Sequence, residues 1–97
     1  MNKYTATFSD GKTIKRSTKR EYAVAWRIQY TSWYGSQCEE TGFSASREQA
    51  QQAARPNLPF SIDRRMSSND KAEAKRKNAE YLATANVVVE IVPAQIH

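Results

Sequence analysis

Large apolar residues recur at every second position between residues 22 and 31, and this pattern constrains the fold more than any other feature of the chain. The alternating positions hold Tyr22, Val24, Trp26, Ile28 and Tyr30. A helix would scatter these side chains around its circumference, whereas a strand places all of them on one face. Most of them are aromatic or β-branched, which are the types that pack best on a pleated sheet. The segment is therefore predicted to be a central strand with Trp26 in the core.

The N-terminal residues predict a β-hairpin. Apolar residues alternate with threonines from position 4 to position 8, as in a half-buried strand. Asp10-Gly11 is a strong turn signal because glycine tolerates positive φ. Residues 13–18 are expected to form the return strand, with Ile14 facing the core. A three-residue turn that begins at Asp10 and contains a glycine bulge would pair Phe8 with Ile14 and keep both on the core side.

Two capping signals predict helices in the second half of the chain. Ser46 and Gln49 have the spacing of a capping box, and Pro56 ends the helix that follows. Ser67 and Asp70 begin a second helix in the same way. The inner faces of both helices are predicted to be small and mostly alanine: Ala50, Ala53 and Ala54 in the first, and Ala72, Ala79, Leu82 and Ala83 in the second.

The remaining segments complete a single α+β domain over residues 1–97. Residues 37–43 predict a weak fourth strand, residues 55–66 an irregular link, and residues 87–92 a last strand that ends at Pro93. The order is strand–strand–strand–(strand)–helix–helix–strand. An antiparallel sheet of about four strands with both helices on one face is the simplest way to bury these segments. The last strand is expected to pair beside the first or the third.

The charge is strongly uneven, although the net value is only +5. One basic cluster lies in and after the predicted hairpin: Lys12, Lys15, Arg16, Lys19, Arg20 and Arg27. The other spans the start of the second helix: Arg64, Arg65, Lys71, Lys75 and Arg76. Lysine and arginine interleaved with hydroxyls suit phosphate contacts, but an edge strand or a solvated helix face carries the same charges. If the two clusters converge, an anionic partner is strongly indicated.

Trp33 and Tyr34 follow the central strand and precede the predicted turn at Gly35. Aromatic side chains at such a place, beside Arg27, suit stacking on a nucleic-acid base or insertion into a pocket of a protein partner. They also suit a simpler role, in which they cover the end of the core. Both interpretations stay open at the level of sequence.

Few residues of the chain suggest catalysis. His97 is the sole histidine and is expected to be frayed at the chain end, and Cys38 is the sole cysteine, so a Ser–His or Cys–His pair and a cysteine metal site are not expected. Phosphate-binding and dinucleotide-binding glycine motifs are missing. We therefore expect a non-enzyme without cofactor or metal. No stretch is apolar enough to span a membrane, which favours the cytoplasm of a bacterial host cell.

Two resemblances bear on function. The three predicted strands followed by residues 43–47 and an alanine-rich helix resemble the layout of integrase arm-type and plant AP2-like DNA-binding domains, in which the sheet enters the major groove. The residues around Asp10-Gly11, Lys15-Arg16-Ser17, residues 22–25 and residues 89–93 are similar to small phage and mobile-element accessory proteins, some of which are anti-CRISPR proteins. The second resemblance implies docking on a host nucleoprotein complex without catalysis.

Three roles follow from these observations. The leading interpretation is a phage-type accessory protein that binds and inhibits a host protein or ribonucleoprotein complex, in the manner of an anti-CRISPR protein. The second is a small basic module that contacts the phosphates of DNA or RNA through its N-terminal hairpin. The third is a homodimeric scaffold that pairs through an open sheet edge. In the first two roles the chain acts as a monomer or a homodimer.

Overall fold

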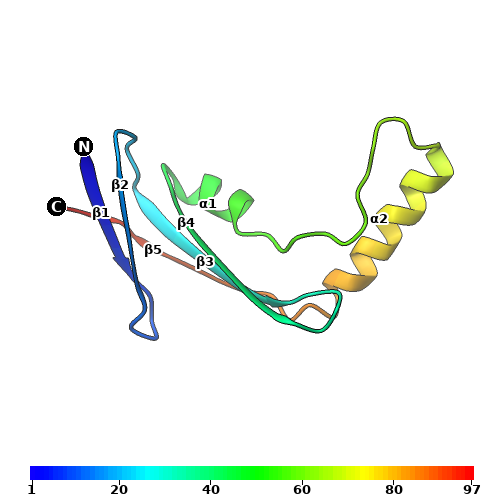
Figure 1. Ribbon diagram of the computed structural model, residues 1–97, viewed down its shortest axis with the longest axis horizontal. Coiled ribbons are helices and arrows are strands. Elements are labelled where there is room, and N and C mark those ends of the chain that lie inside the picture. Colours follow the sequence, from blue (N-terminus) through cyan, green and yellow to red (C-terminus); the bar gives the residue numbers. More distant parts are fainter.

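The predicted central strand is the middle strand of a three-stranded antiparallel sheet. The computed structural model describes residues 1–97, and in it β3 (Val24–Thr31) pairs with β4 (Gln37–Ser44) on one side and β5 (Val88–Pro93) on the other (Figure 1). The weak fourth strand is thus confirmed, as is the pairing of the last long strand beside the third. We call β4-β3-β5 the central sheet.

A second sheet is built from the two ends of the chain. β1 (Asn2–Thr7) pairs with β2 (Thr13–Thr18) and also with β6 (Gln95–Ile96), in the order β2-β1-β6. The α+β class is confirmed, but the expected single sheet of about four strands is replaced by two sheets of three. The physical reason lies after β5, where the chain crosses over and supplies β1 with a partner for its second edge. We call β2-β1-β6 the N-terminal sheet.

The hairpin turn lies one residue earlier than predicted. The ladder pairs Ala6 with Ile14, and the backbone N–H of Phe8 donates to the Lys12 carbonyl oxygen at 2.8 Å. The three loop residues are therefore 9–11, and Gly11 adopts the positive φ of +88° that the turn requires. The pairing register differs from the predicted one by two residues. Side chains alternate between faces with a period of two, so a shift by an even number leaves Phe8 and Ile14 on the same side.

The main core lies between the two sheets. It contains Tyr4, Ala6 and Phe8 from the N-terminal sheet and Ala25 and Phe43 from the central sheet. Ala25 lies on the face of β3 opposite Trp26 and Ile28, so β3 is covered on both faces along its first half. Tyr22 precedes β3 and packs with Ala25 in the main core, so its predicted place on the Trp26 face is wrong. The sequence pattern marked only one of these faces as buried.

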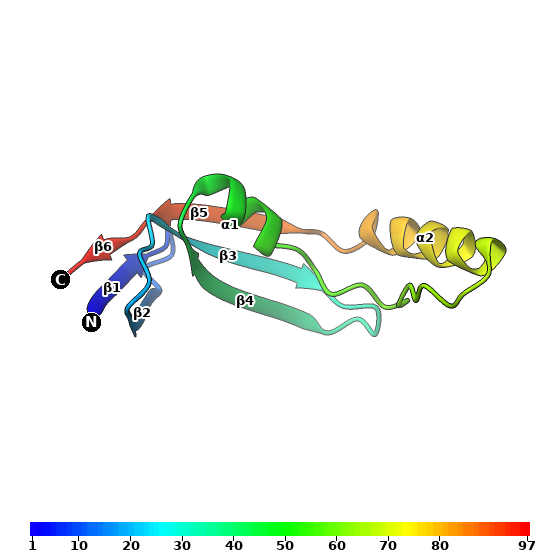
Figure 2. The ribbon, with the colours of Figure 1, turned by 90° about the horizontal axis from the view of Figure 1, so that it is seen from above.

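α1 (Arg47–Ala53) covers one face of the central sheet (Figure 2). The N-terminal sheet packs on the other face, which gives three layers. The Ser46 side chain accepts the Gln49 N–H, as the capping box predicts. Ala50 and Ala54 are buried, and Ala54 packs with Ile28 and Tyr30. The predicted contribution of Ala53 is wrong: this residue is exposed, because the buried face of α1 runs through Ala50 and Ala54, which are four residues apart.

α2 (Ser68–Leu82) stands beyond the end of the central sheet instead of lying on its face (Figure 1). The expectation of two helices on one face is therefore wrong for α2. With this helix extended, the chain measures 51 × 28 × 18 Å and has a radius of gyration of 16.2 Å. A compact domain of this length would have about 12.5 Å.

The inner face of α2 also differs from the prediction. Its buried residues are Ala74, Asn78 and Tyr81, and the predicted stripe of Ala72, Ala79, Leu82 and Ala83 is exposed. The reason is that the helix packs on the irregular link at residues 55–66. The Asn78 amide donates to the Phe60 carbonyl oxygen at 2.9 Å and accepts the Phe60 N–H at 3.1 Å. A polar residue therefore occupies the centre of the buried face.

Gly42 provides a test of how Trp26 packs. Trp26 and Gly42 are cross-strand partners, and a Cβ at Gly42 would lie 2.6 Å from the indole ring. We expect Gly42→Ala to displace the ring and to lower the free energy of unfolding by roughly 1–3 kcal/mol, as overpacking does. Urea unfolding measures this. Thr41→Ala, on the opposite face of the same strand, is the matched control, and equal stability of the two variants would contradict the packing.

Candidate functional site

The outer face of the N-terminal sheet carries only polar side chains from β1 and β2. The register places Lys3 opposite Ser17, Thr5 opposite Lys15 and Thr7 opposite Thr13. These six residues alternate with the buried Tyr4 and Ala6 and their partners, so they point away from the core. The face is therefore a surface of lysines and hydroxyls.

His97 joins this face and is held there. Its backbone N–H donates to the Lys3 carbonyl oxygen at 2.8 Å, and its Nε2 lies 2.6 Å from Thr5 Oγ1. The expectation of a frayed terminal histidine is therefore wrong, because β6 adds a third strand that carries the residue onto the sheet. A shallow pocket of about 370 Å³ lies among His97, Lys3, Lys15 and Ser17.

The cations of this region have no internal counter-charge. The strands of the N-terminal sheet contain no Asp or Glu. None of the five basic side chains in and beside the sheet has a carboxylate within 4.0 Å, while every ion pair of the chain involves other cations. The five are Lys3, Lys15, Arg16, Lys19 and Arg20. Their charges are available to an external anion.

The predicted basic strip is divided between two faces. Lys15 points outward, whereas Arg16 points toward the other side of β2 and lies over the Tyr22 ring, 5.6 Å from its centroid. Lys12 is engaged elsewhere, in an ion pair with Glu39. Neighbouring residues of a strand alternate between faces, so a continuous run of charge cannot form one contact surface.

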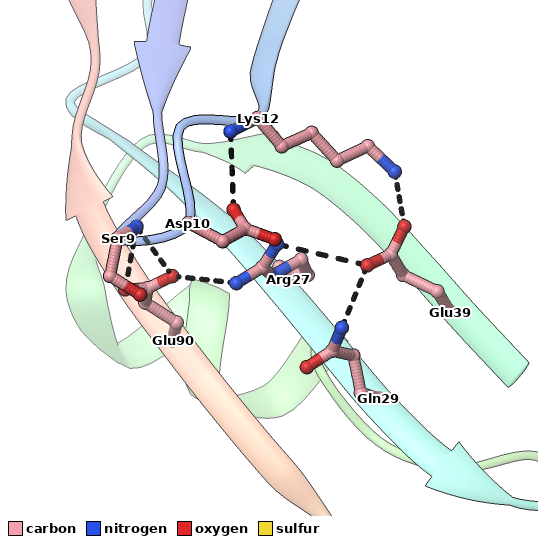
Figure 3. Close-up of polar contacts among 7 residues, drawn as sticks. All are labelled: Ser9, Asp10, Lys12, Arg27, Gln29, Glu39 and Glu90. Carbon is pink, nitrogen blue, oxygen red and sulfur yellow. Dashed lines mark hydrogen bonds and ion pairs between the residues drawn. The ribbon is translucent and has the colours of Figure 1, made fainter.

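Arg27 lies in the interior, not on the binding surface where the sequence analysis placed it. Its side chain is 7% exposed, and its guanidinium lies 2.7 Å from an Asp10 carboxylate oxygen and 3.1 Å from Glu90 (Figure 3). A Glu39 oxygen lies at 3.8 Å, and the Phe8 ring centroid at 4.9 Å. We call Arg27 with Asp10, Glu39 and Glu90 the Arg27 cluster.

Further contacts attach the hairpin loop to this cluster (Figure 3). The Ser9 N–H donates to both Glu90 oxygens, at 3.1 and 3.2 Å. The Gln29 amide donates to Glu39 at 3.0 Å. Glu39 is on β4 and Glu90 is on β5, so the loop after β1 is bonded across all three strands of the central sheet.

The cluster shifts the titration of its members. The hydrogen bond from Arg27 lowers the pKa of Asp10 below its ordinary value. The hydrogen bond from Lys12 is the main cause of the lowered pKa of Glu39, and the hydrogen bond to Asp10 raises the pKa of Arg27. Each shift favours the charged form, so the cluster is held as ion pairs at neutral pH.

The two aromatic residues at the β3–β4 turn have different environments. Trp33 packs edge-on against Phe60 and Tyr81, with ring centroids 5.2 and 6.0 Å away, and so anchors α2 to the end of the sheet. The Tyr81 hydroxyl donates to the Thr31 carbonyl oxygen at 2.7 Å, and burial raises the pKa of Tyr81. Tyr34 is 91% exposed. Only Tyr34 is free to contact a partner with most of its surface.

The second basic cluster lies at the far end of the molecule (Figure 1). Arg64 and Arg65 are in the link and Lys71, Lys75 and Arg76 are on α2, whereas the N-terminal sheet occupies the opposite end. Arg76 pairs with Glu80 at 2.8 Å and approaches Glu73 at 3.9 Å. Lys77 pairs with Glu73 at 3.4 Å. The two basic clusters do not converge.

No group of three or more His, Cys, Asp or Glu side chains is placed to hold a metal ion. Cys38 is unpaired and half-buried, and its thiol lies 3.8 Å from the Ser36 carbonyl oxygen. No helix has both the length and the apolarity to cross a membrane.

Lys3, Thr5, Ser17 and His97 belong to the outer face but were missed in the sequence analysis. A signal for three of them was present, because the alternation that buries Tyr4 turns Lys3 and Thr5 outward, and the hairpin brings Ser17 beside them. His97 had no such signal. Its place depends on a pairing between residues more than ninety positions apart.

Removal of the buried cation tests the Arg27 cluster. Arg27→Met keeps most of the side-chain volume but leaves the Asp10 and Glu90 carboxylates close together without a counter-charge. We expect a lower melting temperature and faster amide exchange in residues 8–12. Lys12→Met is the control, since Lys12 is 46% exposed and pairs with Glu39 alone. A smaller loss in Arg27→Met than in Lys12→Met would contradict the central role of Arg27.

Acid is expected to release the hairpin loop. The pKa values of Asp10 and Glu39 are lower in the folded chain than their ordinary values of about 3.9 and 4.3. The ionised carboxylates therefore stabilise the fold fully at a pH above these ordinary values. This stabilisation is lost as the pH falls through the lower pKa values of the folded chain. The melting temperature should therefore fall more steeply between about pH 5 and pH 3 for the native chain than for Asp10→Asn. Parallel curves would show that Asp10 is not coupled to folding.

No family model, curated protein or solved structure matches this chain. The resemblances to phage accessory proteins and to DNA-binding domains therefore stay predictions. The unpaired cations on the N-terminal sheet are the side chains that bear most directly on function.

Proposed function

We propose that the chain is a non-catalytic binding protein that attaches to the phosphate backbone of a nucleic acid through its N-terminal sheet. The observation that carries the proposal is the outer face of β1 and β2, where Lys3 and Lys15 have no carboxylate partner and lie among the hydroxyls of four neighbouring residues. Lysines and hydroxyls are common donors to phosphate oxygens.

The shape of the face supports the same role. Its side chains are polar, and the sheet beneath them is bonded to the central sheet through the Arg27 cluster. Proteins that read nucleic acids with strands place such a rigid sheet in a groove. Arg27 contributes to this role by positioning the loop, since its guanidinium is already occupied.

Charge reversal tests the proposal. Binding of a short labelled DNA duplex is measured by fluorescence anisotropy at several salt concentrations. We expect Lys3→Glu with Lys15→Glu to abolish binding at moderate salt, and the milder pair Lys3→Gln with Lys15→Gln to reduce the slope of log K against log salt by about 2.

Lys71→Glu with Lys75→Glu is the matched control, because it changes the net charge equally at the opposite end of the chain. If the two glutamate double variants lose affinity equally, only net charge matters and the N-terminal sheet is not the interface. If the native chain does not bind duplex DNA or RNA at low salt, the proposal fails.

A second candidate is inhibition of a host protein or ribonucleoprotein complex by docking, as the resemblance to anti-CRISPR proteins implies. Tyr34 favours it, since this aromatic residue is 91% exposed at the tip of the β3–β4 turn, and interfaces are enriched in tyrosine. A pull-down from bacterial lysate with and without nuclease separates the candidates. A partner that survives nuclease and is lost in Tyr34→Ala supports docking, while recovery that nuclease removes supports nucleic-acid binding.

A further inference from the structure

A pocket of about 580 Å³ lies where β2, the segment that leads into β3 and the junction of β4 with α1 meet. This volume falls in the range of small-molecule sites. Arg16 is the one residue that it shares with the pocket at His97, and neither Lys3 nor Lys15 lines it. The polar side chains that line it are Arg16, Arg20, Glu21, Ser44 and Gln49.

Aromatic rings form the base of this pocket. Tyr22 and Phe43 both line it, with ring centroids 5.8 Å apart, and Tyr4 lies behind Tyr22 at 5.4 Å. Tyr22 is half-buried and lines the pocket. The flat ring of any nucleic-acid base can stack on such a surface.

The polar side chains around the rings form no hydrogen bond or ion pair within the chain. Neither arginine has a carboxylate within 4.0 Å, and the side chains of Glu21, Ser44 and Gln49 form no internal hydrogen bond. Arg16 and Arg20 are exposed, and the Arg16 guanidinium lies over the Tyr22 ring at 5.6 Å. Donors and acceptors therefore converge on the pocket while remaining free to bind a ligand.

We propose that this pocket binds a single unpaired nucleotide, with its phosphate at Arg16 and Arg20 and its base stacked on Tyr22. Guanidinium groups bind phosphate through paired, charge-assisted hydrogen bonds. The proposal deepens the proposed function and rests on it where the nucleotide belongs to a nucleic-acid strand. A free mononucleotide offers the same chemistry.

Glu21 distinguishes a nucleotide from a simple anion. A carboxylate at the rim repels phosphate or an acidic side chain, but it accepts hydrogen bonds from an exocyclic amino group of a base. Gln49, which both donates and accepts, complements the same edge. The pocket therefore favours a base with an amino group, such as cytosine, over uracil, which has a carbonyl at the equivalent position.

Calorimetric titration of the full chain with cytidine 5′-monophosphate and with uridine 5′-monophosphate tests this assignment. We expect the cytidine nucleotide to bind more tightly, and Glu21→Gln to remove the difference. Arg20→Gln should weaken both by about tenfold, as expected for a lost hydrogen bond to a charged group. Arg47→Gln, an exposed arginine of α1 outside the pocket lining, is the control and should bind as the native chain does.

Amide chemical shifts locate the ligand. Shifts centred on Tyr22, Ser44 and Gln49 support the pocket, whereas shifts centred on Lys3 and Lys15 overturn it in favour of the outer face. Absence of binding by either mononucleotide, or equal weakening in Arg20→Gln and Arg47→Gln, also overturns it. Arg20 and Arg47 are both exposed, so the two variants are expected to fold.

The source of the nucleotide is separated with nucleic-acid probes. Enhanced affinity for a duplex with a single unpaired cytidine overhang, relative to the blunt duplex, assigns the pocket to a strand. Equal affinity for both duplexes, together with mononucleotide binding, assigns it to a free nucleotide. The variant Lys3→Glu with Lys15→Glu should lose the blunt duplex but retain the mononucleotide, so the two proposals can fail independently.

Discussion

Arg27 is the one cation whose side chain the fold removes from water, and carboxylates from three separate segments surround it. A guanidinium placed at the middle of a sheet face is costly to bury unless it is paired and hydrogen-bonded. The pairing groups come from the hairpin loop, from β4 and from β5. The loop must therefore lie across the central sheet for the charge to be satisfied, and this condition sets where the N-terminal sheet can sit.

The position of the N-terminal sheet in turn decides which cations are free. Asp10, Glu39 and Glu90 are all directed toward Arg27, and Lys12 takes the remaining side of Glu39. Lys3 and Lys15 on the opposite face form no ion pair. The same stacking brings β2 close to the β4–α1 junction, and the open pocket lined by Arg16 lies between them. The ion pairs of the Arg27 cluster and the unpaired lysines on the outer face are thus both consequences of how the N-terminal sheet stacks on the central sheet.

Much of this fold could be predicted from local pattern, because the strongest signals are local. The alternation in β1 and β3, the caps at Ser46 and Ser67 and the turn at Gly35 each depend on a few adjacent residues. The failures involve partners distant in sequence. α2 carries Ala72 and Ala79 on its exposed side and Ala74 on its buried side, so periodicity could not identify Asn78 as the centre of its buried face. Arg27 falls on the polar side of an alternating strand, and nothing local shows that a second sheet covers it.

The candidate interface itself shows how far such non-local pairing extends. β6 contributes only Gln95 and Ile96 to the ladder, a pairing too short to be read from sequence, and it is enough to place His97 beside Thr5. Bringing together residues more than ninety positions apart costs conformational entropy, and the pairing of a two-residue strand cannot offset this cost alone. The closure is possible because β5 is already paired with β3, which brings the chain to Pro93 beside Val24, and the Ala94 N–H then donates to Ala23. The place of His97 on the basic face therefore depends on the pairing of β5 in the central sheet.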